Sequence, residues 1–368
     1  MTDTTQNLLD TIGDLVELES PTGDLAALER TAAAIAALWE PLGATVTRHE
    51  SEMGPHLVFE VSGRDSDARP VLLVGHHDTV HPVGSLAEMP WRIEGGTAYG
   101  PGCYDMKSGL VIAAEAVRRL QESGVAHPPV IMVVVADEEV GSPTSKELIN
   151  QLAGTVQAAL GFESPHPGGP LKRGRHGSTR LRITVTGKAS HAALDPEAGV
   201  SATNEIVDQL TRLRPVVDRD GVLCNVGSIT APGKTNVVND HAEAELGLRF
   251  ADAATETEVL DQLTSLAPIH PRAEVRVDIL SRRPAWTPAS EDALLTAARA
   301  VAADLGQEFD AFPAAGAADT NAVGGLGVPT LDGLGPWGAG AHATHEQFET
   351  AALEPRIALV KGILAALA

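Results

Sequence analysis

Two apolar runs of strand length constrain this chain more than any other feature, because each leads directly into polar side chains. The runs are Val71–Val74 and Val130–Val135. Apolar residues without alternation indicate strands that are buried on both faces, as in a parallel sheet covered by helices. Gly75–Val80, with two histidines and an aspartate, follows the first run, and Asp137–Glu139 follows the second. Ligands bind at the carboxyl edge of such sheets, so both segments are candidate site residues.

A Gly-rich turn between the two runs adds another acidic candidate. Asp105 lies in the segment Tyr99–Lys107, where Gly100 and Gly102 allow the backbone to turn tightly. A carboxylate in such a turn can bridge two cations. Together with the polar strand ends, it predicts a carboxylate-bridged metal site that performs hydrolysis.

Spacing separates possible ligands from supporting side chains. His76 and Asp78 are two residues apart in extended chain and leave it on one side, which suits a metal-bound imidazole oriented by a carboxylate. His77 points the other way and is interpreted as a non-ligand. Glu138 and Glu139 are adjacent and diverge, so one can bind metal while the other acts as a base. The alternative for this pair is a charged loop at a strand end.

Two further positions extend the candidate set. Glu163 follows a short apolar segment at 160–162, and His342 lies in a Gly-rich loop where His345 competes for the same role. The chain contains neither a His-Glu-x-x-His motif nor a Gly-x-Ser-x-Gly elbow, which disfavours zincins and serine hydrolases. Carboxylates mixed with imidazoles suit Zn²⁺, with Co²⁺ or Mn²⁺ as replacements. Two such ions, ~3.5–4 Å apart, generate hydroxide near neutral pH.

Composition bounds the partners and the compartment. The 368 residues predict about two domains, and the formal net charge of −22 disfavours nucleic acid and anionic membranes as main partners. Anionic small substrates stay open, because a local arginine cluster can override the global charge. Two cysteines cannot build a disulfide framework, and the first residues lack the features of a secretory signal, so we expect a cytoplasmic protein.

Strand and helix patterns predict an α/β fold with an inserted module. Two helical patterns in the first 40 residues are followed by strands that alternate with helices, which indicates a mostly parallel mixed sheet. From about residue 178 strands alternate polar and apolar residues, as in a sheet with one wet face. We therefore predict a catalytic domain at 1–177 and 285–368, and an α+β domain at 178–284.

The ordered set of motifs resembles the M20 family of metallopeptidases and amidohydrolases, nearest to its glutamate carboxypeptidase (carboxypeptidase G2-like) branch. The likeness covers nearly the whole chain and implies a zinc-peptidase-like catalytic domain with an inserted lid and dimerisation domain. The residues that carry it are Gly75–Val80, Gly100–Lys107, Asp137–Ser142, Glu163, Gly187–Ala192, Asn236–Val238, Arg249, Arg283–Pro284, Gly316–Asp319 and His342–Glu346.

The resemblance also implies a role for each residue of the metal site. His76 and Glu163 would hold one zinc ion of each subunit, Glu139 and His342 the other, and Asp105 would bridge the two. Asp78 would orient His76, and Glu138 would take the proton from the attacking water and pass it to the leaving amine. The peptide bond after the bridging aspartate is often cis in this family, which we expect for Asp105–Met106.

Further family roles fall on the inserted module and the segment after it. His191 would stabilise the oxyanion of the intermediate, often from the partner subunit of a homodimer. Asn236 would face the substrate, and Arg249 and Arg283 would grip its carboxylate, because guanidinium groups match carboxylates. The less favoured alternative for each arginine is an ordinary strand-surface residue. Backbone amides of Gly316–Asp319 would assist.

The resemblance implies hydrolysis of an amide next to a free carboxylate in a small molecule or dipeptide. Carboxypeptidase action is the first choice, N-acyl amino acid deacylation the second, and a non-catalytic binding protein on this fold the third. Departures from the nearest branch leave the preferred residue open. The basic residues Lys172, Arg173 and Arg175 are offset from the glutamate-selecting lysine of that branch, and Cys103 beside Asp105 suggests sensitivity to oxidation.

Overall fold

The computed structural model of the protein describes residues 3–368, and these form two compact units. Of these residues, unit 1 comprises 3–174, 288–314 and 318–368, and unit 2 comprises 175–287 with 315–317. The chain leaves unit 1 after residue 174, forms unit 2, and later returns to unit 1. Among residues 3–368, no helix is both long and apolar enough to cross a membrane.

The main sheet of unit 1 has the strand order β1-β2-β6-β3-β7-β16. Strands β6, β3, β7 and β16 run parallel to one another, whereas β1 and β2 pair antiparallel at one edge. The predicted α/β class with a mostly parallel sheet is therefore confirmed. The strands are β1 (Thr45–His49), β2 (His56–Val61), β3 (Val71–His76), β6 (Val130–Val135), β7 (Ala158–Gly161) and β16 (Thr330–Leu331).

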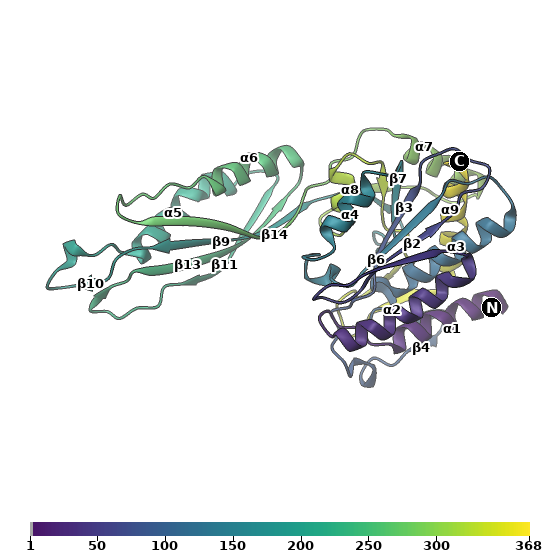
Figure 1. Ribbon diagram of the computed structural model, residues 1–368, viewed down its shortest axis with the longest axis horizontal. Coiled ribbons are helices and arrows are strands. Elements are labelled where there is room, and N and C mark those ends of the chain that lie inside the picture. Colours follow the sequence, from purple (N-terminus) through teal and green to yellow (C-terminus); the bar gives the residue numbers. More distant parts are fainter. Residues whose placement is uncertain (1–2) are drawn as a thin grey trace. The chain divides into compact units, whose positions relative to one another are not determined.

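Helices lie on both faces of this sheet (Figure 1), and apolar side chains pack between the helices and the strands, which explains the uninterrupted runs in the sequence. In β3, Val71 and Leu73 belong to one core, while Leu72 and Val74 belong to another. Five helices contribute to the first core, namely α1 (Asp3–Glu17), α2 (Leu25–Trp39), α3 (Ser108–Ser123), α7 (Ala293–Asp304) and α9 (Leu353–Ala366). Two contribute to the second, α4 (Lys146–Ala153) and α8 (Thr320–Gly325).

Two small sheets complete unit 1. One has the order β17-β18-β5-β4, and it joins the loop of His342 to the segment that leads into Asp105. The other pairs β15 with β8. Their strands are β4 (Arg92–Glu94), β5 (Thr97–Tyr99), β8 (Leu171–Arg175), β15 (Ala311–Ala314), β17 (Gly338–Ala339) and β18 (Gln347–Glu349).

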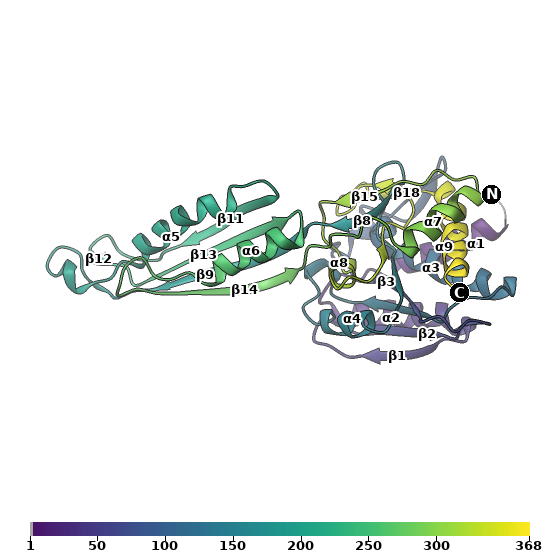
Figure 2. The same ribbon diagram turned by 90° about the horizontal axis from the view of Figure 1, so that it is seen from above.

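Unit 2 is an antiparallel sheet in the order β11-β13-β9-β14, with helices α5 and α6 on one face (Figure 2). The alternation of β9 sends Leu181, Ile183 and Val185 into the core against the helices, while Arg180 and Arg182 lie on the other face. A short hairpin pairs β10 with β12. The elements are β9 (Gly177–Thr186), β10 (Ser190–His191), α5 (Ala202–Val217), β11 (Val222–Thr230), β12 (Val237–Val238), β13 (His241–Phe250), α6 (Ala253–Thr264) and β14 (Glu274–Arg283).

Candidate metal centre

Three parallel strands bring the candidate residues of unit 1 to one edge of the sheet. Strand β3 lies between β6 and β7 and ends at His76. Glu138 and Glu139 follow β6, and Glu163 follows β7. Since parallel strands end at the same edge, their polar ends converge, as in other open α/β sheets.

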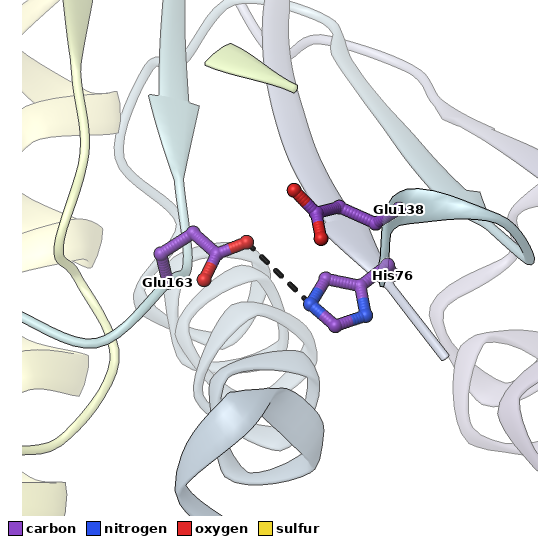
Figure 3. Close-up of side chains that lie close together, drawn as sticks. All are labelled: His76, Glu138 and Glu163. Atoms are coloured by element: carbon purple, nitrogen blue, oxygen red, sulfur yellow. Dashed lines mark ion pairs between the residues drawn. The ribbon is translucent and has the colours of Figure 1, made fainter. Parts of the chain in front are cut away.

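The imidazole of His76 is almost fully buried and faces carboxylates on both sides. Its Nε2 lies 3.3 Å from Asp105 Oδ1 and 3.5 Å from Glu163 Oε1, and its Nδ1 lies 3.3 Å from Asp78 Oδ1. Figure 3 shows the carboxylates of Glu163 and Glu138 close to the His76 ring, each from a segment that follows a different strand. Two groups of side chains place possible ligand atoms within 4.8 Å of one another: His76, Glu138 and Glu163, and His76, Asp105 and Glu139.

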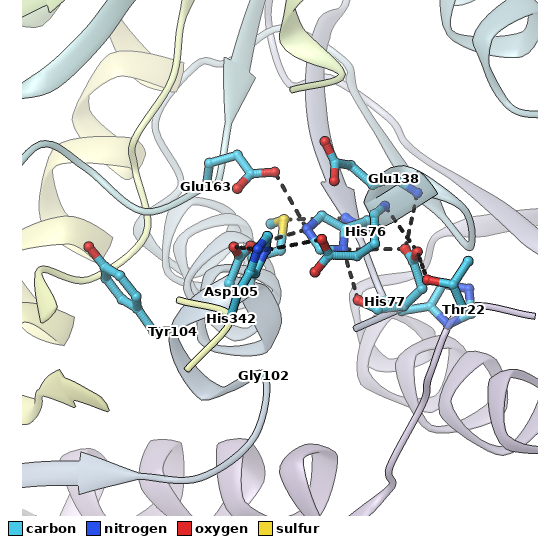
Figure 4. Close-up of polar contacts among 12 residues, drawn as sticks. Thr22, His76, His77, Gly102, Tyr104, Asp105, Glu138, Glu163 and His342 are labelled. Carbon is cyan, nitrogen blue, oxygen red and sulfur yellow. Dashed lines mark hydrogen bonds and ion pairs between the residues drawn. The ribbon is translucent and has the colours of Figure 1, made fainter. Parts of the chain in front are cut away.

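The two carboxylate oxygens of Asp105 face different imidazoles. Oδ1 faces His76, whereas Oδ2 lies 3.4 Å from His342 Nε2 (Figure 4). Gly102 begins the turn with φ +71°, in the left-handed region that favours glycine. The Asp105–Met106 peptide bond is cis, as the resemblance led us to expect. This carboxylate therefore lies between two possible cation positions.

Glu139 and His342 complete the second group of donors. His342 Nε2 lies 3.1 Å from Glu139 Oε2. The backbone of His342 has φ +62°, an uncommon conformation for a residue with a side chain. Both His342 and its competitor His345 are exposed, but it is His342 that forms ion pairs with Asp105 and Glu139. The geometry therefore favours His342 over His345.

Asp78 connects His76 to the turn that carries the two glutamates. Its Oδ1 accepts a hydrogen bond from the Glu138 N–H, and its Oδ2 accepts one from the Glu139 N–H, each 3.2 Å long. Thr22 Oγ1 donates a further hydrogen bond of 2.7 Å to Oδ2. Asp78 thus contacts the His76 ring and also two backbone amides of the turn after the neighbouring strand.

The packed carboxylates and imidazoles shift one another's pKa values. Burial lowers the pKa of His76, but Asp105, Asp78 and Glu163 outweigh it and raise that pKa well above its usual value. The hydrogen bonds of His342 with Asp105 and Glu139 raise its pKa to about 10. Burial raises the pKa of Asp105, but the two histidines outweigh it and hold that pKa far below its usual range. The excess of carboxylates therefore favours positive charge on both imidazoles, and a metal ion bound there would have to replace those protons.

The residues fit divalent metal ions on structural grounds. His76 Nε2 and Glu139 Oε1 are buried without a hydrogen-bond partner, which is costly unless another group satisfies them. Both residues belong to the group of possible ligands that also contains Asp105. Imidazole nitrogens with carboxylate oxygens are donors that Zn²⁺ accepts. His76, Glu163, Glu139 and His342 would hold two such ions, with Asp105 shared between them.

The other predicted site residues belong to unit 2, except Asp319. His191 pairs with Val237 in the short hairpin, and the Asn236 carbonyl accepts a hydrogen bond from the Ala192 N–H. Arg249 on β13 and Arg283 on β14 both pair with Ser178 of β9, so the two arginines share one face of the sheet.

The remaining two substrate candidates have polar contacts of their own. The Gly316 carbonyl accepts a hydrogen bond of 2.8 Å from Arg175 Nη1. Asp319, in unit 1, accepts a hydrogen bond from Ser142 Oγ. The first contact lies within unit 2 and the second within unit 1.

Two side chains near the centre have structural roles. His77 lies 3.0 Å from the Pro55 carbonyl through Nε2, and burial lowers its pKa to about 4. Cys103 is fully buried, and burial raises the pKa of its thiol well above the usual value. Because the thiolate is the reactive form, the expected sensitivity of Cys103 to oxidation is not supported.

Sequence reasoning gave no role to several residues that hold the centre in place. Thr22 contacts Asp78 from the N-terminal segment. Asp137 accepts hydrogen bonds from Thr144 and Ser145, which fixes the loop after Glu138. Glu346 contacts the turn of Asp105. The available signal was weak: each is a polar residue next to a predicted site segment or a Pro-Thr-Gly turn.

Comparison with known sequences decides the family. Residues 72–366 match the sequence profile described as Peptidase family M20/M25/M40. The chain belongs to this M20 family. It is 32% identical over 369 residues to carboxypeptidase G2 of Pseudomonas sp. (strain RS-16), across 96% of this chain and 88% of that protein. Succinyl-diaminopimelate desuccinylase of Gluconacetobacter diazotrophicus is 29% identical over 248 residues, or 61% of this chain and 60% of that protein.

Solved structures of M20 peptidases share the fold of this M20 chain. Aminopeptidase PepT from Bacillus cereus superposes with a TM-score of 0.77 at 21% identity, over 99% of this chain and 98% of that one. The metallo-carboxypeptidase Sso-CP2 from Sulfolobus solfataricus gives a TM-score of 0.70 at 16% identity, over 100% and 99%. The predicted family is confirmed, and the M20 chain is a metallohydrolase of the peptidase or deacylase kind.

Proposed function

We propose that this M20 chain is a di-zinc carboxypeptidase that releases a C-terminal amino acid from a small substrate. The observation that carries the proposal is the orientation of Asp105, whose two carboxylate oxygens face His76 and His342 separately. The likeness to carboxypeptidase G2 across 96% of the chain favours this reaction within the family. Co²⁺ or Mn²⁺ are proposed replacements for zinc.

Glu138 is the proposed general base. Zinc ions supply Lewis acidity and lower the pKa of water when they are bound. The Glu138 carboxylate lies beside His76 and Glu163, and its backbone is fixed by Asp78. In this position it takes a proton from the attacking water and returns that proton to the leaving nitrogen. Adjacent Glu139 faces His342 and is assigned to metal binding.

The residues of unit 2 are assigned to the substrate on the family resemblance. His191 stabilises the developing oxyanion, in its own subunit or in a partner, and Asn236 contacts the substrate. Arg249 and Arg283 bind the free carboxylate, which their shared rung with Ser178 supports. Backbone amides at Gly316 and Asp319 are proposed to assist.

N-acyl amino acid deacylation is the second candidate reaction. The likeness to succinyl-diaminopimelate desuccinylase favours it. The two reactions use the same attack on an amide and differ in the group that occupies the acyl side of the pocket. Two of the basic side chains that follow Glu163 already donate hydrogen bonds to backbone carbonyls. Arg173 donates to the Ser290 carbonyl and Arg175 to the Gly316 carbonyl.

A homodimer formed through unit 2 is also proposed. Strand β11 is an edge of its sheet and exposes Leu223 (67%) and Ile229 (54%). A groove of about 510 Å³ between α5 and β11 is lined by apolar side chains that include Leu210 and Val226. Open strand edges with apolar residues favour pairing with another chain. Light scattering after gel filtration tests this, and Ile229→Asp is expected to give a monomer.

The deciding experiment is product release from a defined panel, measured by mass spectrometry. The zinc-loaded protein is mixed with N-acetyl, N-succinyl, N-benzoyl and folyl amino acids and with dipeptides, and a chelated sample serves as control. Chelator-sensitive release of an amino acid from dipeptides or folyl conjugates supports the carboxypeptidase. Release confined to simple N-acyl amino acids supports the deacylase. Release that chelation does not affect contradicts both.

A cytoplasmic location is also our proposal, because Cys103 and Cys224 are both free thiols.

A further inference from the structure

Glu346 is a buried carboxylate whose two oxygens are both saturated by donors from distant parts of unit 1. Its Oε1 accepts hydrogen bonds from the backbone N–H groups of Tyr104 and Asp105, 2.8 and 2.9 Å long. Its Oε2 accepts one from the Gly102 N–H at 2.8 Å and lies 2.7 Å from His81 Nε2. A carboxylate only accepts, so the His81 ring donates through Nε2.

These four donors come from the two segments that carry His76 and Asp105. His81 lies five residues after His76, in the loop that follows β3. The other three donors form the turn that ends at Asp105, and Figure 4 shows this turn with Gly102, Tyr104 and Asp105 beside His342. Glu346 itself lies four residues after His342. One carboxylate therefore joins the three loops that supply three of the candidate ligands.

The strands next to Glu346 fix its own backbone. Strand β18 begins at the following residue and pairs with β5, which leads into the Gly102 turn. The Gly100 N–H also donates a hydrogen bond to the Glu346 carbonyl. These contacts fix the backbone of Glu346, so that its carboxylate is a fixed hydrogen-bond acceptor. The backbone amides of residues 104 and 105 must follow its position.

The position of the Asp105 side chain depends on these hydrogen bonds between Glu346 and the turn. Its Oδ1 and Oδ2 lie 3.3 and 3.4 Å from the two imidazoles, so a small rotation of the turn would favour one histidine over the other. A buried carboxylate is costly to leave unpaired, and hydrogen bonds to a charged acceptor are about twice as strong as neutral ones. Three such contacts to its backbone N–H groups give the turn one preferred conformation.

We propose that Glu346 is a positioning residue of the metal centre, which sets the distance between Asp105 and His342 and so the affinity for both ions. The inference rests on the proposed di-metal function but adds a residue that does not itself bind metal. Groups that orient metal ligands typically change metal affinity about 10- to 100-fold when they are lost. We expect a change of that size here.

The principal variant is Glu346→Gln, which keeps the shape and removes one acceptor. Whichever oxygen becomes the amide nitrogen, it faces at least one backbone N–H, from Gly102 on one side or from Tyr104 and Asp105 on the other. Two donors cannot satisfy each other. The expected result is a zinc affinity about 10- to 100-fold lower, measured by competition with a chromophoric chelator. Glu346→Asp keeps both acceptors and is expected to lose less.

A matched control separates positioning from general destabilisation. Glu205 in unit 2 is also fully buried and accepts two backbone N–H groups, from Ile269 and His270. Glu205→Gln is therefore expected to destabilise its own unit while the zinc affinity stays at the wild-type value. An equal loss of zinc affinity in Glu205→Gln and Glu346→Gln would overturn the inference.

The outcomes distinguish this inference from the proposed function. Wild-type protein that binds no divalent ion, as measured by plasma mass spectrometry after gel filtration, contradicts both. Wild-type protein that binds two ions, with an unchanged affinity in Glu346→Gln, contradicts the inference alone. If Glu346→Gln does not fold, Glu346→Asp and Glu205→Asp decide the matter. A several-fold weaker zinc affinity only in Glu346→Asp supports the inference, and equal affinities in both variants overturn it.

Discussion

Thr22 donates a hydrogen bond of 2.7 Å to Asp78, although 56 residues separate them in the chain. The contact lies beside a short parallel bridge between Pro21 and Thr79, and Ser20 Oγ donates to the His77 carbonyl in the same place. Residues 20–22 of the N-terminal segment thus contact the loop that follows β3 and stabilise it. It also precedes residue 72, where the match to the M20 profile begins. The support of Asp78 therefore reaches beyond the matched region.

We predict that Thr22→Val lowers kcat/KM about 10-fold, because the valine has the same shape but cannot hold Asp78 against His76. Thr22→Ser keeps the hydroxyl and is expected to restore most of the activity. Thr31→Val is the matched control, since the buried Thr31 hydroxyl contacts only the Ala27 and Leu18 carbonyls among the hydrogen bonds identified here. Steady-state kinetics on the three variants provide the check. A wild-type rate in Thr22→Val would remove the supporting role.

The adjacent pair Glu138 and Glu139 gives two opposite predictions. Glu138→Gln is expected to lower kcat by about 10²- to 10⁴-fold while two metal ions stay bound, because a general base is lost and no ligand is. Glu139→Gln is expected to weaken binding of one ion, because its carboxylate faces His342 at 3.1 Å. Metal content and turnover are measured on the same samples. Full turnover in Glu138→Gln would move the base to another group.

The sequence predicted those parts of the centre that depend on strand ends. His76, Glu138 and Glu163 follow apolar runs of β3, β6 and β7, and neighbouring parallel strands must bring such residues together. Their convergence therefore needs only the strand order. The change to alternating polarity at β9 is the signal from which we predicted a separate domain at 178–284.

Contacts between loops could not be predicted in the same way. Glu346 meets the Asp105 turn 241 residues away, and its partners are backbone amides, which every sequence offers. A residue type carries no information about such a partner. The short strands β17 and β18, which determine this meeting, contain only a few residues each and show no periodicity. Only the folded chain shows which amides a carboxylate reaches.

Arg249 gives a prediction about substrate recognition. Its Nη1 donates a hydrogen bond of 2.5 Å to Ser178 Oγ, and the same rung contains Arg283. We predict that Arg249→Ala raises KM about 10- to 100-fold for a substrate with a free carboxylate, the effect of one lost charge-assisted hydrogen bond. kcat should change little. A carboxamide analogue of the substrate should bind the variant and the wild type equally.

Arg180 provides the control for this prediction. It extends from β9 on the same face of the sheet as Arg249, and it is largely exposed. Arg180→Ala is expected to leave KM unchanged, because an exposed arginine two residues along the strand from Ser178 is not assigned to the substrate. If both substitutions raise KM equally, the effect comes from the charge of the whole face. The specific role of Arg249 would then be withdrawn.

Glu205 gives a prediction about stability and pH. Burial raises its pKa, but hydrogen bonds from Ile269, Gln209 and His270 outweigh it, so its pKa lies below the usual value. A carboxyl group with a lowered pKa in the folded state stabilises the protein above its unfolded pKa, about 4.3, and loses that contribution as the pH falls. Glu205→Gln is therefore expected to lower the free energy of unfolding by about 2 kcal/mol at pH 7. The difference should shrink as the pH falls below about 4.

Urea unfolding of the chelated protein at pH 7, 4 and 3 measures this difference without a contribution from metal release. Glu258→Gln serves as the control, because Glu258 is exposed and pairs only with Arg219 among the ion pairs identified here. Exposed ion pairs contribute little to stability, so this variant should follow the wild type at each pH. A constant difference between Glu205→Gln and wild type at all three values would mean that the loss comes from packing. In that case the ionisation of Glu205 would not contribute to stability, although its carboxyl group accepts two backbone hydrogen bonds that join α5 to residues 269–270.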